Sequence, residues 1–160
     1  MWNSKKSTVL SIVVCWVVVA GLTVGIFFGP WLITTWFTLV RQWESDHVGT
    51  QRMLILFCSA FYPCAVLAYV TLYNLIRMLY NIRNEQVFTH QNVAHLRRIS
   101  WCCFGVAAVT LVVGVLPYNP FTTPFLLITA AAAFVGLMLR VVKNVMERAV
   151  DIREENELTI

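Results

Sequence analysis

The sequence predicts an all-α, polytopic membrane protein in which four transmembrane helices form an antiparallel bundle. Hydrophobic residues make up 59% of the 160 residues and charged residues only 12%, whereas soluble domains contain about 25% charged residues. Four uncharged stretches each approach the roughly 20 residues that a helix needs to cross the hydrocarbon core. They are residues 9–28, 53–76, 99–116 and 121–139. The composition therefore excludes a disordered chain and argues against a soluble globule.

The uncharged stretches are predicted to be helices because lipid offers the backbone no hydrogen-bond partners, and a helix satisfies its own. A transmembrane β-barrel would show segments of about ten residues that alternate in polarity. Residues 12–19 instead form an unbroken apolar run, Ile-Val-Val-Cys-Trp-Val-Val-Val. The sequence therefore favours helices over strands.

The first stretch has some features of a cleavable signal peptide, since it follows Lys5 and Lys6 and has small residues up to Ala20. Its apolar run continues past Ala20 to residue 28, so we expect the first helix to be retained. The following residues, 31–43, are rich in Trp, which favours the headgroup level. We expect either a short interfacial helix there or an extension of the first span.

The second stretch contains Pro63, which removes one backbone hydrogen bond and is expected to bend the helix. A simple packing kink and a gating hinge are both open interpretations of this proline. The third and fourth stretches are separated only by residues 117–120, so their helices should be antiparallel neighbours.

The fourth helix is expected to continue into the cytoplasm to about Glu154, so that residues 140–160 form a helical tail. No Gly or Pro interrupts it there, and apolar residues recur at 4-3-4-3 spacing, which places them on one face. We call this face the apolar stripe; its members are Met138, Val142, Val145, Ala149 and Ile152. The stripe should cover either the extension of the second helix or a second copy of the chain.

The distribution of Lys and Arg predicts that both termini lie in the cytoplasm and that the chain resides in the cytoplasmic (inner) membrane. Lys and Arg are retained on the cytoplasmic side of membrane proteins. Only Arg41 and Arg52 lie in the first connection, and the other ten Lys and Arg residues lie in the N-terminal tail, the second connection or the C-terminal tail. This asymmetry gives a multi-pass topology with four spans.

Small residues on two of the predicted helices suggest where backbones approach each other closely. Gly21, Gly25 and Gly29 share one face of the first helix, and Ala132 and Gly136 belong to a small face of the fourth. These faces would serve either packing within one bundle or a homodimer interface.

Two oppositely charged segments are predicted to form the interaction site. The second connection contains four Arg residues against one Glu, and the last ten residues contain four acids against one Arg. We expect the acidic tail to dock on the basic connection, or else the arginines to contact anionic lipids while the tail stays solvated. The candidate interaction residues are Arg77, Arg83, Arg97, Arg98, Glu154, Glu155, Asn156 and Glu157.

The sequence contains no recognisable catalytic or cofactor-binding pattern. His90 and His95 have the spacing of half a zinc site but no Cys-x-x-Cys partner, and all five cysteines fall inside predicted spans. The spans contain no ionisable acid, base or imidazole, which speaks against an ion pathway, and no basic groove suits direct nucleic-acid binding. We expect no catalytic residue, no cofactor and no bound metal.

Three parts of the chain resemble a family of bacterial membrane proteins known as domain of unknown function 2975. They are the Phe61-Tyr62-Pro63 segment with residues 75–82, the segment 87–99, in which Thr89 is a predicted helix cap, and the tail 149–160. The likeness covers about residues 53–160. It implies a four-helix membrane architecture with no established activity. By gene association only, it also implies a cytoplasmic helix-turn-helix regulator as a partner.

The function expected from these patterns is that of a non-enzymatic interaction or regulatory module, which acts through its cytoplasmic loop and acidic tail. The alternative is a small oligomeric channel or transporter subunit assembled on the face of Gly21, Gly25 and Gly29. The expected partners are the lipid bilayer, a second copy of the chain in a homodimer, and the implied regulator.

Overall fold

The computed structural model describes residues 4–40, 47–84, 87–116 and 121–157, and all regular secondary structure in these ranges is α-helical. The helices are α1 (Ser4–Val40), α2 (His47–Arg83), α3 (His90–Gly114) and α4 (Thr122–Glu157). All four are long and apolar enough to cross a membrane. This confirms the predicted all-α class with four transmembrane helices, and the chain is a multi-pass membrane protein.

Three of the four helices are much longer than a bilayer requires. The helices α1 and α2 have 37 residues each and α4 has 36, whereas α3 has 25. At about 1.5 Å per residue the long helices measure roughly 55 Å, against a hydrocarbon core of about 30 Å. The long helices must therefore tilt or project beyond the lipid.

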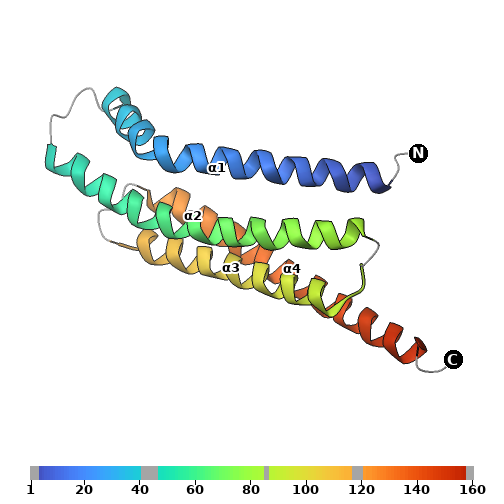
Figure 1. Ribbon diagram of the computed structural model, residues 1–160. Helices are drawn as coiled ribbons and strands as arrows, with labels where there is room; N and C mark the ends of the chain where they lie inside the picture. Colours follow the sequence, from blue (N-terminus) through green and yellow to red (C-terminus); the bar gives the residue numbers. More distant parts are fainter. Residues whose placement is uncertain (1–3, 41–46, 85–86, 117–120, 158–160) are drawn as a thin grey trace.

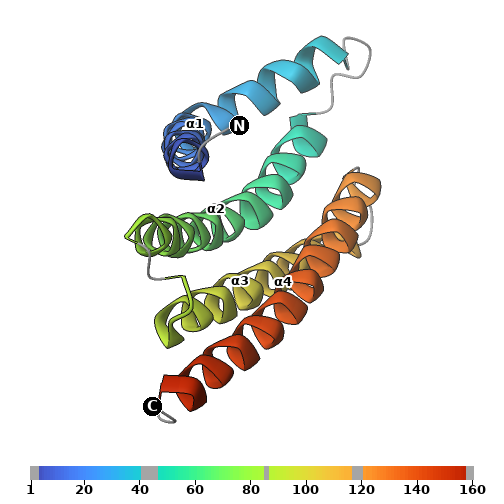
Figure 2. The same ribbon diagram turned by 90° about the vertical axis from the view of Figure 1, so that its right-hand side faces the viewer.

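The helix α1 passes through Pro30 without ending and continues to Val40. Residues 31–40 therefore extend the first span, which is one of the two predicted alternatives for residues 31–43, while residues 41–43 lie outside the described part. Proline is tolerated inside membrane helices because neighbouring groups can satisfy the backbone carbonyl that it leaves unpaired. In α2, Pro63 also lies inside the helix, and α2 curves along its length (Figure 2).

The four helices form an open row in which each helix lies alongside only its neighbours in the sequence. The backbones of α1 and α2, of α2 and α3, and of α3 and α4 lie side by side, and no other pair of helices has Cα atoms within 8 Å of each other in the described residues. Successive helices run in opposite directions (Figure 1), so that both chain ends and the α2–α3 connection lie at the same end of the molecule. The sequence predicted a bundle; the structure specifies a row whose outer members, α1 and α4, do not touch each other.

The helix α1 is attached to α2 by a few contacts. The hydroxyl groups of Thr23 and Tyr69 form a hydrogen bond of 2.7 Å, and a Cβ at Gly29 would lie 3.5 Å from the Phe61 ring. Most large side chains of α1 are exposed, including Phe27 at 77%. Because these side chains are apolar and lie on a helix long enough to cross a membrane, they are free to contact lipid or another membrane helix.

The helices α2, α3 and α4 share a small apolar core near the α3–α4 connection. Ala60, Val113 and Phe125 are buried together, and Leu56 and Phe121 pack against them. Towards the middle of the membrane, the hydroxyl groups of Thr110 and Thr129 join α3 to α4 at 2.8 Å. Hydrogen bonds of this kind contribute about 0.6 kcal/mol each between membrane helices, so most of the cohesion comes from close packing.

Candidate interaction surface at the polar end

Most of the described charged side chains gather where α2 ends, α3 begins and α4 continues towards the C-terminus. We call this region the polar end and define it as residues 77–84, 87–100 and 140–157. Figure 1 shows that it lies at the same end of the molecule as both termini, and that the last turns of α4 project beyond the other helices. The predicted interaction residues all belong to the polar end.

A buried amide network joins α2 to α3 at the polar end. Asn92 is fully buried, with 0% exposure. Its side-chain nitrogen donates to the backbone oxygen of Val87 at 2.9 Å, and its side-chain oxygen accepts a hydrogen bond from Asn81 at 2.9 Å. Buried polar groups are stable in such places only when they are hydrogen-bonded. Asn92 therefore fixes the α2–α3 connection against both helices.

A second polar pair lies one turn further towards the membrane. Asn74 is 3% exposed and donates to the backbone oxygen of Val70 at 2.7 Å. Its side-chain oxygen lies 2.8 Å from Nδ1 of His95. His95, which the sequence singled out only for its zinc-like spacing from His90, is thus paired with α2. This pair and the Asn92 network together hold α2 and α3 in register.

The helix α3 begins at His90, with Thr89 at the N-cap position. The backbone oxygen of Thr89 accepts hydrogen bonds from the amide groups of Asn92 and Val93. The Thr89 hydroxyl does not bond to the helix backbone, and it is buried without a partner among the described residues. The position of the cap was predicted from the sequence, but the side-chain hydrogen bond typical of a capping threonine is absent.

A histidine–carboxylate hydrogen bond and an arginine–glutamate ion pair join α3 to the projecting part of α4. Nε2 of His90 lies 2.9 Å from a carboxylate oxygen of Glu154, so the acidic tail meets the basic connection at this residue. Glu147 lies about one turn before Val150 on α4. One of its carboxylate oxygens is 2.6 Å from Nζ of Lys143, and the other is 3.5 Å from a guanidinium nitrogen of Arg97. These contacts place a charged face of α4 against α3, and Val150, 2% exposed, is buried between them.

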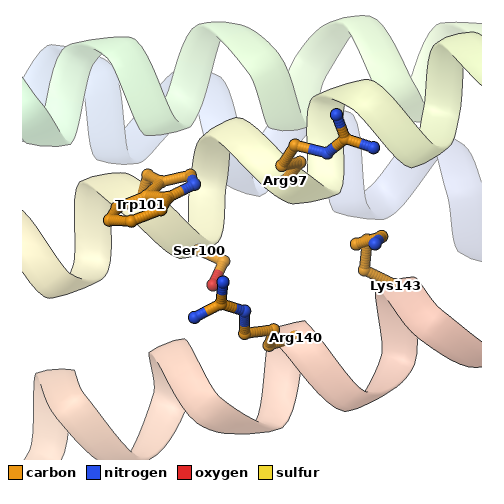
Figure 3. A pocket seen from close by; sticks show the side chains of 5 residues that line it. All are labelled: Arg97, Ser100, Trp101, Arg140 and Lys143. Carbon is orange, nitrogen blue, oxygen red and sulfur yellow. The ribbon is translucent and has the colours of Figure 1, made fainter.

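A small pocket opens between α3 and α4 at the membrane edge of the polar end (Figure 3). Arg97, Ser100 and Trp101 of α3 line it together with Arg140 and Lys143 of α4. The Arg140 guanidinium lies over the Trp101 ring, 5.5 Å from its centroid. The Ser100 hydroxyl donates to the backbone oxygen of Gly136 at 2.9 Å. The arrangement concentrates three cations around a narrow opening.

The other predicted interaction residues are not gathered into one site. Arg77 donates to the Tyr73 hydroxyl at 3.2 Å and lies over the Tyr73 ring. Among the rest, Arg83, Arg98, Glu155 and Asn156 are exposed at the polar end. Glu157 belongs to α4, but its side chain lies outside the described part. Arg97, by contrast, reaches α4, where its guanidinium group lies 3.5 Å from a carboxylate oxygen of Glu147.

The apolar stripe of α4 does not cover α2. Beyond the core that they share near the α3–α4 connection, α2 and α4 diverge, and no Cα atoms of the two helices lie within 8 Å of each other in the described residues. The stripe therefore does not pack on the extension of α2, the first of the two predicted alternatives. Four members of the stripe are exposed to between 49% and 64%: Met138, Val142, Val145 and Ile152. The face that packs against α3 is instead the one that contains Lys143, Glu147 and Val150. The stripe is thus available to another molecule or to lipid.

The small residues of α1 and α4 differ in whether they contact a neighbouring helix. A Cβ at Gly21 or Gly25 would meet no atom within 4 Å, so packing within the same chain, one predicted alternative, is wrong for these two residues. Gly29 does contact Phe61. On α4, Ala132 is partly buried, and a Cβ at Gly136 would lie 3.3 Å from the Cβ of Cys103. Gly136 therefore permits the close approach of α3 and α4.

Two residues that organise this surface, Asn92 and Glu147, are not among the interaction residues predicted from the sequence. A signal existed for both. Asn92 shares a helical face with Leu96 and Ile99, which are buried, and Glu147 follows Lys143 at i,i+4 spacing, which favours an ion pair. Neither pattern alone indicates which neighbouring helix supplies the remaining partner.

The described residues include no group of three His, Cys, Asp or Glu side chains that could hold a metal ion. All five cysteines are free thiols.

Comparison with known proteins gives one match. A family described as "Protein of unknown function (DUF2975)" matches residues 38–160. The match includes α2, α3 and α4 and leaves almost all of α1 outside. No curated protein and no solved structure matches the chain.

Proposed function

The chain belongs to the DUF2975 family, and from this premise we propose that it is a non-enzymatic interaction module of the bacterial cytoplasmic membrane. Four helices hold it in the lipid, and the polar end faces the cytoplasm, where it binds another protein. The distribution of Lys and Arg supports this orientation, because only Arg41 and Arg52 fall on the opposite side.

The observation that most supports this proposal is the exposed apolar stripe on the projecting part of α4. Val142, Val145 and Ile152 follow Arg140, where the uncharged span ends, and they are 49%, 64% and 59% exposed. Covering apolar surface releases about 25 cal/mol per Å². The opposite face of the helix is engaged with α3, so a partner can bind the stripe without displacing any contact within the chain.

The chemistry around the stripe indicates what kind of partner would fit. Residues 151–157 contain four acids against Arg153, a net charge of −3. An amphipathic helix with an apolar face and a basic rim would match both features. We propose such a helix, supplied by a soluble protein. The implied helix-turn-helix regulator would suit this role, since DNA-binding proteins have basic surfaces.

Charged substitutions in the stripe test this function. We expect the double variant Val145→Glu, Ile152→Glu to reduce capture of the soluble partner from native membranes roughly tenfold or more, because apolar anchors typically contribute over about 1 kcal/mol each. Photo-crosslinking from position 142, an exposed member of the stripe that the double variant leaves unchanged, identifies the partner and measures its occupancy. The matched control is Asn144→Glu, which adds a charge at an exposed residue of the same helix outside the stripe. Equal adducts from wild type and the double variant would contradict the proposal.

A second function, a small oligomeric channel or transporter subunit, is favoured by the open face at Gly21 and Gly25. Pure protein in liposomes distinguishes the two. The interaction module should give no solute flux above empty liposomes. Flux that disappears in Gly25→Leu but persists in Leu22→Ala, a change beside the glycine face, would establish the channel instead.

A further inference from the structure

We infer that the pocket between α3 and α4 binds the phosphate group of an anionic lipid headgroup, held by Arg97, Arg140 and Lys143. This headgroup site is separate from the apolar stripe and does not depend on the proposed function. The position, the charge and the size of the pocket each support this inference.

The pocket lies at the level where charge begins on both helices. On α3, Arg98 is the last ionisable side chain before the uncharged stretch 99–116, and on α4, Arg140 is the first after the uncharged stretch 121–139. Lipid phosphates lie just outside the hydrocarbon core, and Trp residues such as Trp101 favour the same level. The cations of the pocket therefore meet the headgroup layer whichever side of the membrane it faces.

The pocket has an excess of positive charge. Arg97, Arg140 and Lys143 contribute three positive charges. Glu147, which pairs with Lys143 and Arg97, contributes one negative charge. The net charge is thus +2. No carboxylate pairs with Arg140 in the described part of the chain; its contact is with the Trp101 ring, which also lines the pocket. An anion can bind Arg140 without displacing an ion pair.

The pocket is large enough to bind one small charged group and too small to enclose a typical organic ligand. Its cavity volume is about 80 Å³, whereas sites for small organic ligands usually measure about 300–1,000 Å³. Ser100 closes the inner side, because it is 4% exposed and bonded to Gly136. Next to the pocket on the membrane side, Leu137 is 55% exposed. A lipid could place its phosphate among the cations and its acyl chains along this apolar surface.

Binding of defined lipids to the purified full-length chain tests the site. Native mass spectrometry in a neutral detergent would compare phosphatidylglycerol with phosphatidylcholine. We expect one phosphatidylglycerol bound preferentially, and about 30-fold weaker binding in Arg140→Gln, Lys143→Gln, because each cation near a lipid surface typically contributes about a factor of five. The matched control, Arg83→Gln, Arg148→Gln, removes two exposed arginines outside the pocket and should bind nearly as wild type.

A second variant, which is expected to bind phosphatidylglycerol more tightly, tests the site even if the Arg140, Lys143 double variant folds poorly. Glu147→Gln removes the acid beside Lys143 and Arg97, so phosphatidylglycerol should bind about fivefold more tightly, whereas Asp151→Asn at an exposed position should change little. Equal affinity for the two lipids, or an unchanged double variant, would overturn the inference. A separate arm adds inorganic phosphate at the lipid concentration: displacement would assign the pocket to a free anion and overturn the lipid assignment.

Discussion

Gly136→Leu is expected to destabilise the protein by about 3 kcal/mol, since overpacking at a tight interface costs about 1–3 kcal/mol and further contacts are lost with it. A Cβ at this position would already lie 3.3 Å from the Cβ of Cys103 and from the Phe104 ring. A leucine side chain would force α3 and α4 apart and strain the hydrogen bond from Ser100 to the Gly136 oxygen, 2.9 Å in length.

Thermal unfolding of the purified chain in detergent, followed by circular dichroism, measures this effect. A loss of about 3 kcal/mol should lower the midpoint of the transition in which α3 and α4 separate by roughly 6–12 °C for a chain of this size. Gly21→Leu is the matched control, because no atom of the chain lies within 4 Å of its Cβ position. An equal decrease in both variants would show that α3 and α4 are not closely packed at Gly136.

Asn92→Leu is expected to destabilise the polar end by about 2 kcal/mol. The asparagine is fully buried, and leucine would leave the Asn81 amide and the Val87 oxygen without the partners that they have now. An unsatisfied buried polar group costs about 1–3 kcal/mol. The α2–α3 connection should loosen first, because Val87 lies within it.

Limited proteolysis of the α2–α3 connection, together with the unfolding midpoint, measures the effect of Asn92→Leu. Asn144→Leu is the control, because Asn144 is exposed on α4. Cleavage near Val87 should become faster only in the Asn92 variant. Unchanged cleavage would show that the amide network does not hold the connection in place.

The fold class was predictable from the sequence because an uncharged stretch of about 20 residues has few stable states other than a membrane helix. The ends of the helices were less predictable. The helix α1 crosses Pro30, and α2 begins at His47, before the predicted span. Membrane helices tolerate proline and can include polar residues outside the lipid, so charge alone does not mark where a helix ends.

The orientation of α4 could not be derived from its periodicity. The 4-3-4-3 spacing identified an apolar stripe, but in a membrane protein an apolar face can meet lipid as readily as protein. The face that packs on α3 contains Lys143 and Glu147 because ion pairs with Arg97 are available beyond the end of the span. The choice depends on the neighbouring helix, which the α4 sequence does not specify.

The sequence indicated the region of the candidate site, but it did not identify the individual residues that form the site. The charge asymmetry indicated the ends of α2, α3 and α4, where the structure places the His90–Glu154 and Arg97–Glu147 contacts. It did not identify Asn92, whose partner Asn81 lies across the α2–α3 connection, nor the pocket that includes Ser100 and Trp101. Such sites depend on the relative rotation of two helices, and hydropathy contains no information about that angle.

The arrangement of the helices in a single row also determines the order in which they unfold on heating. In a closed bundle every helix has two or more neighbours, and loss of one disrupts all. Here α1 touches only α2, so it can detach while α2, α3 and α4 keep their contacts, as a terminal unit does in a repeat protein. Melting of this chain should therefore be sequential, with α1 leaving first, instead of an all-or-none transition.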